Sequence, residues 1–289
     1  MSSLTEAAAL VVLLRTGARP WQQYADLVEE AGSAVAVLER ERGGQSSLFA
    51  ADDADADAET DVETWRREGI ELLTVLDAAY PQNLRTVHDR PPLIFVDGVL
   101  RTSDARAVAV IGARAATPGG RAAAAEIAQH LVRESYTVVS GLATGIDAVA
   151  HTATLAHGGR TVAVIGTGLM RAYPPQNAAL QRRISTQGAV VSQFWPDAPP
   201  TRRTFPMRNA VMSGMTLASV VVDASPTSGA RIQARLALEH GRQVFLLEPL
   251  LTQAWARELA RRPGAHVVCA PREITAMLER PSADSSLTA

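Results

Sequence analysis

The stretch VVSGLATGIDAVAH, residues 138–151, decides the fold class. An apolar run of β-branched residues ends at Ser140 and Gly141, and Gly145 then precedes a run with helical spacing. This order predicts a buried strand, a tight turn and a helix that carries Asp147 in its first turn. The free N–H groups at such a helix start can bind an anion, whereas the plainer interpretation is that the glycines only turn the chain.

Similar units occur on both sides of this stretch, because short β-rich runs alternate with alanine-rich helical runs from about Ile70 onward. We therefore predict an α/β fold with a doubly wound, mostly parallel, extended Rossmann-like sheet. In such sheets ligands bind beyond the carboxyl ends of the strands. The predicted strands are an edge pair, 71–77 and 93–98, followed by 107–112, 137–141, 161–166, 189–194, 217–224, 243–248 and 266–270. The predicted helices between them are 119–134, 145–157, 177–187, 228–240 and 252–262.

The chain divides into three predicted parts. Residues 1–49 are predicted as a small helical N-terminal domain, because apolar residues recur every three to four positions. Residues 50–61, the end of a small, polar and acidic stretch that begins at Gly43, are predicted as a mobile linker because they cannot bury a core. Residues 62–289 are predicted as the Rossmann-like domain.

Composition narrows the function classes. The 289 residues are 47% hydrophobic and carry a net charge of −2, and all 28 basic residues are arginine, so any phosphate contact uses a planar, bidentate guanidinium. With one cysteine, Cys269, we expect neither an internal disulfide nor a zinc cluster, and a cytoplasmic location. No apolar run approaches the roughly 18 residues of a membrane span, and no basic region precedes the apolar N-terminal stretch, so neither membrane insertion nor a signal peptide is expected.

Three predicted strand ends combine glycine with a helix start, and three such ends in one sheet favour a ligand cleft. The residues at these ends are Gly112 with Arg114, then Ser140, Gly141 and Gly145, and finally Ser228 and Gly229.

A basic cluster that contains one aromatic residue precedes a predicted apolar helix. Arg208 and Asn209, at the end of this cluster, are predicted to lie in a hinge before the helix. Arginines around an aromatic ring suit a phosphate backbone with stackable bases, although a solvated charged loop fits the same composition. The cluster consists of Arg202, Arg203, Phe205, Arg208 and Asn209.

Two enzymatic interpretations are weaker. Gly166 and Gly168 form a G-x-G pattern after a strand, but Arg171 occupies the position of the third glycine that dinucleotide binding requires. Asp147 and His151 lie four residues apart and could form an acid–base pair, but an acid that complements the helix start and steadies the histidine is the preferred interpretation. We therefore predict no catalytic residue, no enzymatic activity, no cofactor and no metal ligand.

Seven motifs in order resemble the DprA/Smf family of DNA-processing proteins, over about residues 72–245. The resemblance implies an extended Rossmann fold that binds single-stranded DNA without base specificity. It also implies a homodimer that helps load a RecA-type recombinase during DNA uptake (natural transformation) or recombination. The motifs are YPQNL with DRPPLIFVDGVL, VAVIGARAATPGG, VVSGLATGIDAVAH, TVAVIGTGLMRAYPPQN, QGAVVSQFWPDAPP, FPMRN and SGARIQARLALEHGRQVF.

Carried over by position, the resemblance gives roles to several of these residues. Arg114 contacts phosphate; Ser140, Gly141 and Gly145 form the anion-binding turn. The family's F-P-x-R-N-R core and late Ser-Gly turn are matched by Arg208, Asn209, Ser228 and Gly229.

The sequence also departs from the family pattern. Thr144 and Ala210 stand where the family often has a basic residue, and PLL (residues 249–251) replaces the usual Pro-Gly. The winged helix of many members is not expected after Glu279. Two other classes stay open: a nucleotide-binding relative of the phosphoribohydrolase type, whose P-G-G-x-G-T motif is only approximated by TPGG and TSGARIQ, and a scaffold without a ligand.

Overall fold

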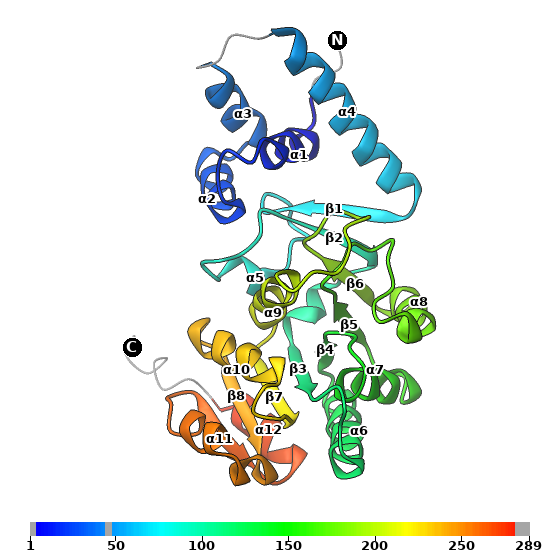
Figure 1. The fold of residues 1–289 in the computed structure, drawn as a ribbon, viewed down its shortest axis with the longest axis vertical. Coiled ribbons are helices and arrows are strands. Elements are labelled where there is room, and N and C mark those ends of the chain that lie inside the picture. Colours follow the sequence, from blue (N-terminus) through cyan, green and yellow to red (C-terminus); the bar gives the residue numbers. More distant parts are fainter. Residues whose placement is uncertain (1–3, 44–47, 281–289) are drawn as a thin grey trace.

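In the computed structural model, one nine-stranded sheet runs through most of the protein (Figure 1). The structure describes residues 4–43 and 48–280. The strand order is β1-β2-β6-β5-β4-β3-β7-β8-β9, with β1 and β2 antiparallel at one edge and all strands from β6 to β9 parallel. The predicted α/β class and the mostly parallel sheet are confirmed. The strands are β1 (Ile70–Thr74), β2 (Leu93–Gly98), β3 (Ala107–Gly112), β4 (Thr137–Ser140), β5 (Thr161–Val164), β6 (Ala189–Ser192), β7 (Ala218–Asp223), β8 (Gln243–Leu247) and β9 (Ala265–Val268).

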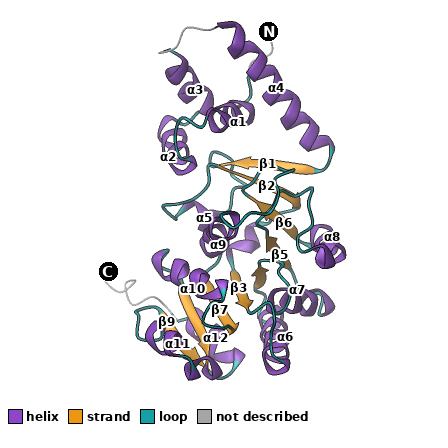
Figure 2. Cartoon of the chain, in the orientation of Figure 1, coloured by secondary structure: helices purple, strands orange, loops and turns teal. Residues whose placement is uncertain are grey.

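Helices cover both faces of this sheet (Figure 2). The helices are α1 (Glu6–Thr16), α2 (Trp21–Ala31), α3 (Ala34–Arg42), α4 (Leu48–Arg67), α5 (Gln82–Arg85), α6 (Pro118–Arg133), α7 (Ile146–Ala156), α8 (Ala178–Gln187), α9 (Thr204–Met215), α10 (Gly229–Glu239), α11 (Ala254–Leu259) and α12 (Pro271–Leu278).

Strand β3 illustrates why the apolar runs become central strands. Successive strand side chains point to opposite faces, so a strand covered on both faces must be apolar at every position. Val108 and Val110 pack in one buried cluster with α6, α7 and α12, whereas Ala109 and Ile111 pack in a second cluster that contains α9 and α10. At β3 the sheet therefore separates two hydrophobic cores.

The connection from β6 to β7 determines where a ligand can bind. Strands β3 to β6 are added in one direction, and α9 then carries the chain back so that β7 pairs with the other side of β3. This reversal is a topological switch point, at which the loops on the two sides of β3 diverge and leave a crevice.

The acidic segment 50–61 is not the mobile linker that its composition predicts, because it lies within helix α4. Local composition cannot reveal the distant arginines that pair with its carboxylates: Arg42 contacts Asp55, and Arg15 lies 2.5 Å from Asp61. Residues 44–47 of the same acidic stretch lie outside the described residues. The division into a helical domain, 1–49, and a Rossmann-like domain, 62–289, stays a prediction.

The N-terminal helices share a core with the sheet. Leu10 and Leu13 of α1 belong to the same buried cluster as Leu73 of β1 and Phe95 of β2. Trp65, near the end of α4, packs edge-on against Phe95, with ring centroids 5.1 Å apart. Within the part of the chain that the structure describes, no helix is both long and apolar enough to span a membrane.

Candidate functional site

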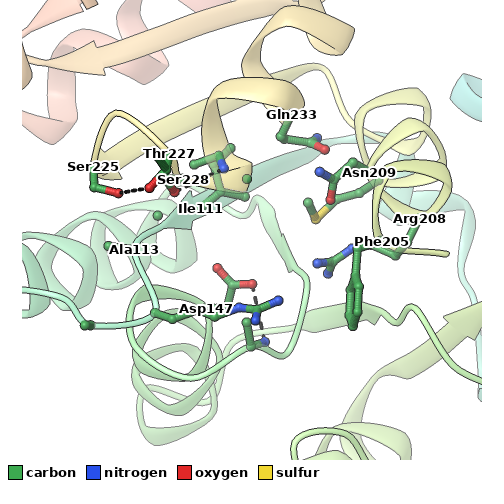
Figure 3. A pocket seen from close by; sticks show the side chains of 17 residues that line it. Ile111, Ala113, Asp147, Phe205, Arg208, Asn209, Ser225, Thr227, Ser228 and Gln233 are labelled. Atoms are coloured by element: carbon green, nitrogen blue, oxygen red, sulfur yellow. Dashed lines mark hydrogen bonds between the residues drawn. The ribbon is translucent and has the colours of Figure 1, made fainter. Parts of the chain in front are cut away.

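A cleft of about 500 Å³ opens at the switch point, beyond the carboxyl ends of β3 and β7 (Figure 3). Its walls come from the β3–α6 loop, the start of α7, one face of α9 and the loop that leads into α10. Four chain segments that are far apart in sequence therefore converge on one crevice. Of the predicted site residues, those that line the cleft are Arg114, Phe205, Arg208, Asn209, Ser228 and Gly229.

The start of α10 is one helix N-terminus on this cleft. Ser228 caps the helix, and its hydroxyl accepts a hydrogen bond of 3.3 Å from the N–H of Ala230. A Cβ atom at Gly229 would meet nothing within 4 Å, so the backbone there is open. The adjoining Thr227 and Ser228 add hydroxyls to the wall. Free N–H groups and the positive end of the helix dipole make this corner suitable for an anion.

The start of α6 has a different environment. The hydroxyl of Thr117 accepts a hydrogen bond of 3.0 Å from the N–H of Gly120, and Asp223 accepts one of 2.9 Å from the N–H of Thr117. A carboxylate thus already occupies the positive end of this helix. The first predicted strand end therefore contributes the Arg114 side chain to the cleft, and its helix N-terminus is satisfied internally.

The glycines at the start of α7 allow close packing. Gly145 has φ +81°, and a Cβ atom there would overlap the carbonyl oxygens of Ala113 and Arg114. A Cβ atom at Gly141 would overlap the guanidinium of Arg208. Both glycines therefore let the turn approach the neighbouring segments, as the plainer interpretation of the sequence holds.

The three predicted residues of this turn do not lie together in the cleft. Ser140 is buried, and its hydroxyl donates a hydrogen bond of 2.6 Å to the carbonyl oxygen of Val110. Neither Ser140 nor Gly145 lines the cleft, whereas Gly141 lines a smaller adjoining cavity of about 50 Å³. Thr144, one of the departures from the family pattern, lines that smaller cavity as well.

Arg208 and Asn209 are not in a hinge, as the sequence suggested, but inside helix α9, where both are buried. Pro206 lies in the first turn of that helix, where the missing N–H costs nothing, so it does not break the helix. The Nη1 of Arg208 donates a hydrogen bond of 2.9 Å to the carbonyl oxygen of Val164. This contact ties α9 to the end of β5.

Arg208 is electrostatically coupled to Asp147, the acid in the first turn of α7. Burial raises the pKa of Asp147, and the positive charge of Arg208 opposes that rise. Burial lowers the pKa of Arg208, and the carboxylate of Asp147 opposes that fall. Each buried charge therefore stabilises the charged form of the other at the floor of the cleft.

His151 does not form an acid–base pair with Asp147. Its Nδ1 lies 2.7 Å from the hydroxyl of Thr161, in a fully buried position. Burial lowers the pKa of His151 to about 3, and the charge of Arg208 adds to this effect. The imidazole is therefore neutral near pH 7, and its contact is with β5. The expectation that Asp147 steadies it is wrong.

An exposed arginine and two aromatic rings lie together at the rim of the site. The guanidinium carbon of Arg114 lies 5.4 Å from the centroid of the Phe205 ring. The ring of Tyr173, which is 39% exposed, lies 5.7 Å from that of Phe205. Sequence reasoning missed Tyr173, for which the only signal was an aromatic residue in the loop after a strand-end glycine. Arg202 and Arg203 are exposed in the turn before α9 and line neither cavity.

Comparison with known proteins agrees with this architecture. Residues 71–279 match the family described as DNA recombination-mediator protein A. The chain belongs to this family. The resemblance to DprA/Smf proteins that the motifs indicated is thereby confirmed.

Two members of the family show the extent of the similarity. Protein Smf of Synechocystis is 36% identical over 223 residues, which are 75% of this chain and 56% of the relative. DNA processing protein DprA of Streptococcus pneumoniae is 40% identical over 174 residues, 60% of this chain and 61% of the relative. The chain thus spans little more than half the length of these relatives.

Solved structures of family members share the fold. The X-ray structure of DprA from Streptococcus pneumoniae has a TM-score of 0.70 and 30% identity, and the match covers 95% of this chain and 93% of that one. DNA processing protein A from Helicobacter pylori, whose structure is described for its single-stranded DNA binding mode, has a TM-score of 0.64 and 24% identity. That match covers 72% of this chain and 95% of the other.

Proposed function

We propose that the cleft binds the backbone of single-stranded DNA with little preference among bases. The observation that carries the proposal is the exposed guanidinium of Arg114, held beside Phe205 at the mouth of a switch-point cleft. A guanidinium binds a phosphate through two parallel hydrogen bonds, and an aromatic face stacks on any base. The open N-terminus of α10 supplies a second position for a phosphate.

The remaining predicted residues have supporting positions in this proposal. Gly141 and Gly145 let the start of α7 approach Arg208 and the β3–α6 loop, and Ser140 anchors the end of β4 beneath them. Arg202 and Arg203 extend the basic surface ahead of α9, where a longer strand passes beyond Phe205. Thr144 and Ala210 supply no charge, which leaves fewer phosphate contacts than the family pattern implies.

We propose further that the protein acts in the cytoplasm as a homodimer without catalytic activity, and that it helps load a RecA-type recombinase onto the bound strand. The family's description as a recombination mediator supports this role. Three measurements test it: sedimentation for the dimer, recombinase assembly on covered single-stranded DNA, and recovery of the DNA uncleaved. No acceleration of recombinase assembly would contradict the loading role.

A nucleotide-binding role is the second candidate. A volume of about 500 Å³ falls in the range of small-molecule pockets, and hydroxyls and a helix N-terminus lie together at one end of the cleft. Competition separates the two candidates. A mononucleotide that displaces single-stranded DNA only at far higher concentration supports the DNA role, and one that binds more tightly than the oligonucleotide overturns it.

We expect tighter binding to single-stranded than to double-stranded DNA, with affinity that falls steeply with salt. Each neutralised phosphate releases a counterion, so log affinity should fall against log salt by about 0.7 per contact on a single strand. Titration of labelled oligonucleotides at several salt concentrations measures both properties. Equal affinity for the duplex, or affinity that does not respond to salt, would contradict the proposal.

Arg114→Ala should weaken single-stranded DNA binding by about 1–3 kcal/mol, because it removes a charge-assisted contact. The melting temperature should barely change, since Arg114 is exposed in a loop. Arg183→Ala, at an exposed position of α8, is the matched control and should bind normally. If Arg114→Ala melts at a lower temperature but binds as well as the unmodified chain, Arg114 has a structural role only.

A further inference from the structure

A second group of polar side chains lies at the opposite end of α10 from the cleft. His88 and Asp89 come from the loop after α5, and His240 caps the C-terminus of α10. One ligand atom of each residue lies within 4.8 Å of the others. The rings of His88 and His240 meet edge to face, with centroids 5.6 Å apart.

Ser213 contacts the inner nitrogen of the His240 ring. The Ser213 hydroxyl lies 2.9 Å from Nδ1 of His240 and 3.1 Å from the carbonyl oxygen of Ala210. With Nδ1 held in this way, Nε2 of His240 faces Asp89. A hydrogen bond from the other ring nitrogen is the usual way in which a metal-binding histidine is oriented.

Nε2 of His240 faces a carboxylate. It lies 2.8 Å from Oδ1 of Asp89, which is an ion pair when the imidazole is protonated, and neither atom has another hydrogen-bond partner among the described residues. The His240 side chain is 0% exposed, and that of Asp89 is 24% exposed. A neutral imidazole nitrogen and a carboxylate oxygen at this separation need either a proton or a metal cation between them.

We propose that His88, Asp89 and His240 bind one divalent first-row transition-metal ion of the zinc class. Two imidazole nitrogens and one carboxylate oxygen are borderline donors that suit this class, and three protein ligands leave a fourth position for water. His88 is exposed, which gives the ion access from solvent. Metal binding would tie the loop after α5 to α9 and α10, the two helices that also line the DNA cleft.

The sequence offered no warning of this site, and the expectation of no metal ligand rested on local patterns. Metal motifs are recognised by short spacings between ligands, whereas residues 88–89 and 240 are brought together only by the packing of α5, α9 and α10.

Cobalt(II) binding to the full chain, after removal of metals with a chelator, tests the proposal. One equivalent of Co²⁺ should produce visible absorption typical of few-coordinate nitrogen and oxygen ligation, and Zn²⁺ should displace it. Zn²⁺ should also raise the melting temperature, because an ion that binds only the folded state stabilises it. No saturable absorption and no thermal shift would overturn the proposal.

Variants separate metal binding from a simple ion pair. His88→Ala should weaken Co²⁺ binding by about 100-fold or more, since even outer-shell partners contribute 10–100-fold, and the metal-free melting temperature should stay unchanged. His157→Ala, which removes another exposed histidine, should bind Co²⁺ normally. Equal Co²⁺ affinity in His88→Ala and the unmodified chain would overturn the site. The site would also be overturned if Asp89→Asn lost the same stability with and without Zn²⁺. The contact would then be an ion pair between a protonated His240 and Asp89.

Discussion

Replacing Arg208 with alanine is expected to destabilise the protein by about 3–5 kcal/mol, the cost of leaving a buried charge without its partner. Arg208 is buried in α9, donates to the carbonyl oxygen of Val164 and opposes the desolvation of Asp147. Its loss leaves the Asp147 carboxylate buried without the cation that opposes its desolvation, and with the N–H of Ala143 as a remaining partner. Urea unfolding at pH 7 measures the effect, and single-stranded DNA binding should fall with it.

The pH dependence of this variant identifies the cause. The pKa of Asp147 is already raised in the folded state, and without Arg208 it should rise further. A raised folded-state pKa means that the folded protein binds the proton more tightly. The variant should therefore lose most stability above that pKa and recover part of it as pH falls toward the ordinary pKa of aspartic acid.

The double variant Arg208→Ala with Asp147→Asn is the control. Without the carboxylate it should unfold at higher urea than Arg208→Ala at pH 8, and the additional pH dependence should disappear. If Arg208→Ala lost the same free energy of unfolding at pH 5 and pH 8, the coupling between the two charges would be refuted. Lost packing of the arginine side chain would then explain the destabilisation.

A chain shortened to begin at Asp61 is expected to be insoluble or to lack a cooperative melting transition. The sequence suggested the reverse, since every sheet motif lies beyond that point. In the structure, Leu10 and Leu13 of α1 are fully buried in the core that also contains Leu73 and Phe95. Removing α1 and most of α4 would expose that apolar surface.

Near-ultraviolet circular dichroism and thermal melting of the shortened chain check this expectation. Leu13→Ala in the full chain is a milder comparison and should cost about 2–5 kcal/mol, the range for a buried leucine. A soluble, cooperatively melting fragment that still binds DNA would instead support the division into domains 1–49 and 62–289.

The sheet could be predicted because its signals are local. Runs such as AVAVIG and TVAVIG consist of small and β-branched residues bounded by glycine, and a central parallel strand requires that pattern at every position. The edge pair of β1 and β2 also followed from two apolar runs around a turn-rich segment, and the structure adds that the two strands are antiparallel. Strand type and order along the chain therefore follow from short stretches. Of the three predicted strand ends, Arg114 and the Ser228–Gly229 turn line the cleft, and Ser140 and Gly145 do not.

What the sequence did not predict depends on distant partners. Helix α4 forms although its residues are acidic, and arginines from α1 and α3 pair with two of its carboxylates. Arg208 is a polar residue that composition assigns to a loop, yet it is buried because Gly141 leaves room for its guanidinium. Tyr173 joins Phe205 only through the fold of the β5–α8 connection. Such contacts join residues far apart in sequence, which local patterns do not encode.

The aromatic contacts between the N-terminal helices and the sheet have a spectroscopic consequence. Three of the four tryptophans, Trp21, Trp65 and Trp195, form a cluster. The ring centroid of Trp195 lies 5.4 Å from that of Trp21 and 6.0 Å from that of Trp65. The segment that begins at Trp195 forms backbone hydrogen bonds of 2.9 Å with Gly168 and Met170, in the connection that also carries Tyr173, which lines the smaller cavity beside the candidate cleft. Emission from this cluster should therefore change both when the helices detach and when a strand binds at the rim, so the unlabelled protein reports on both events by its own fluorescence.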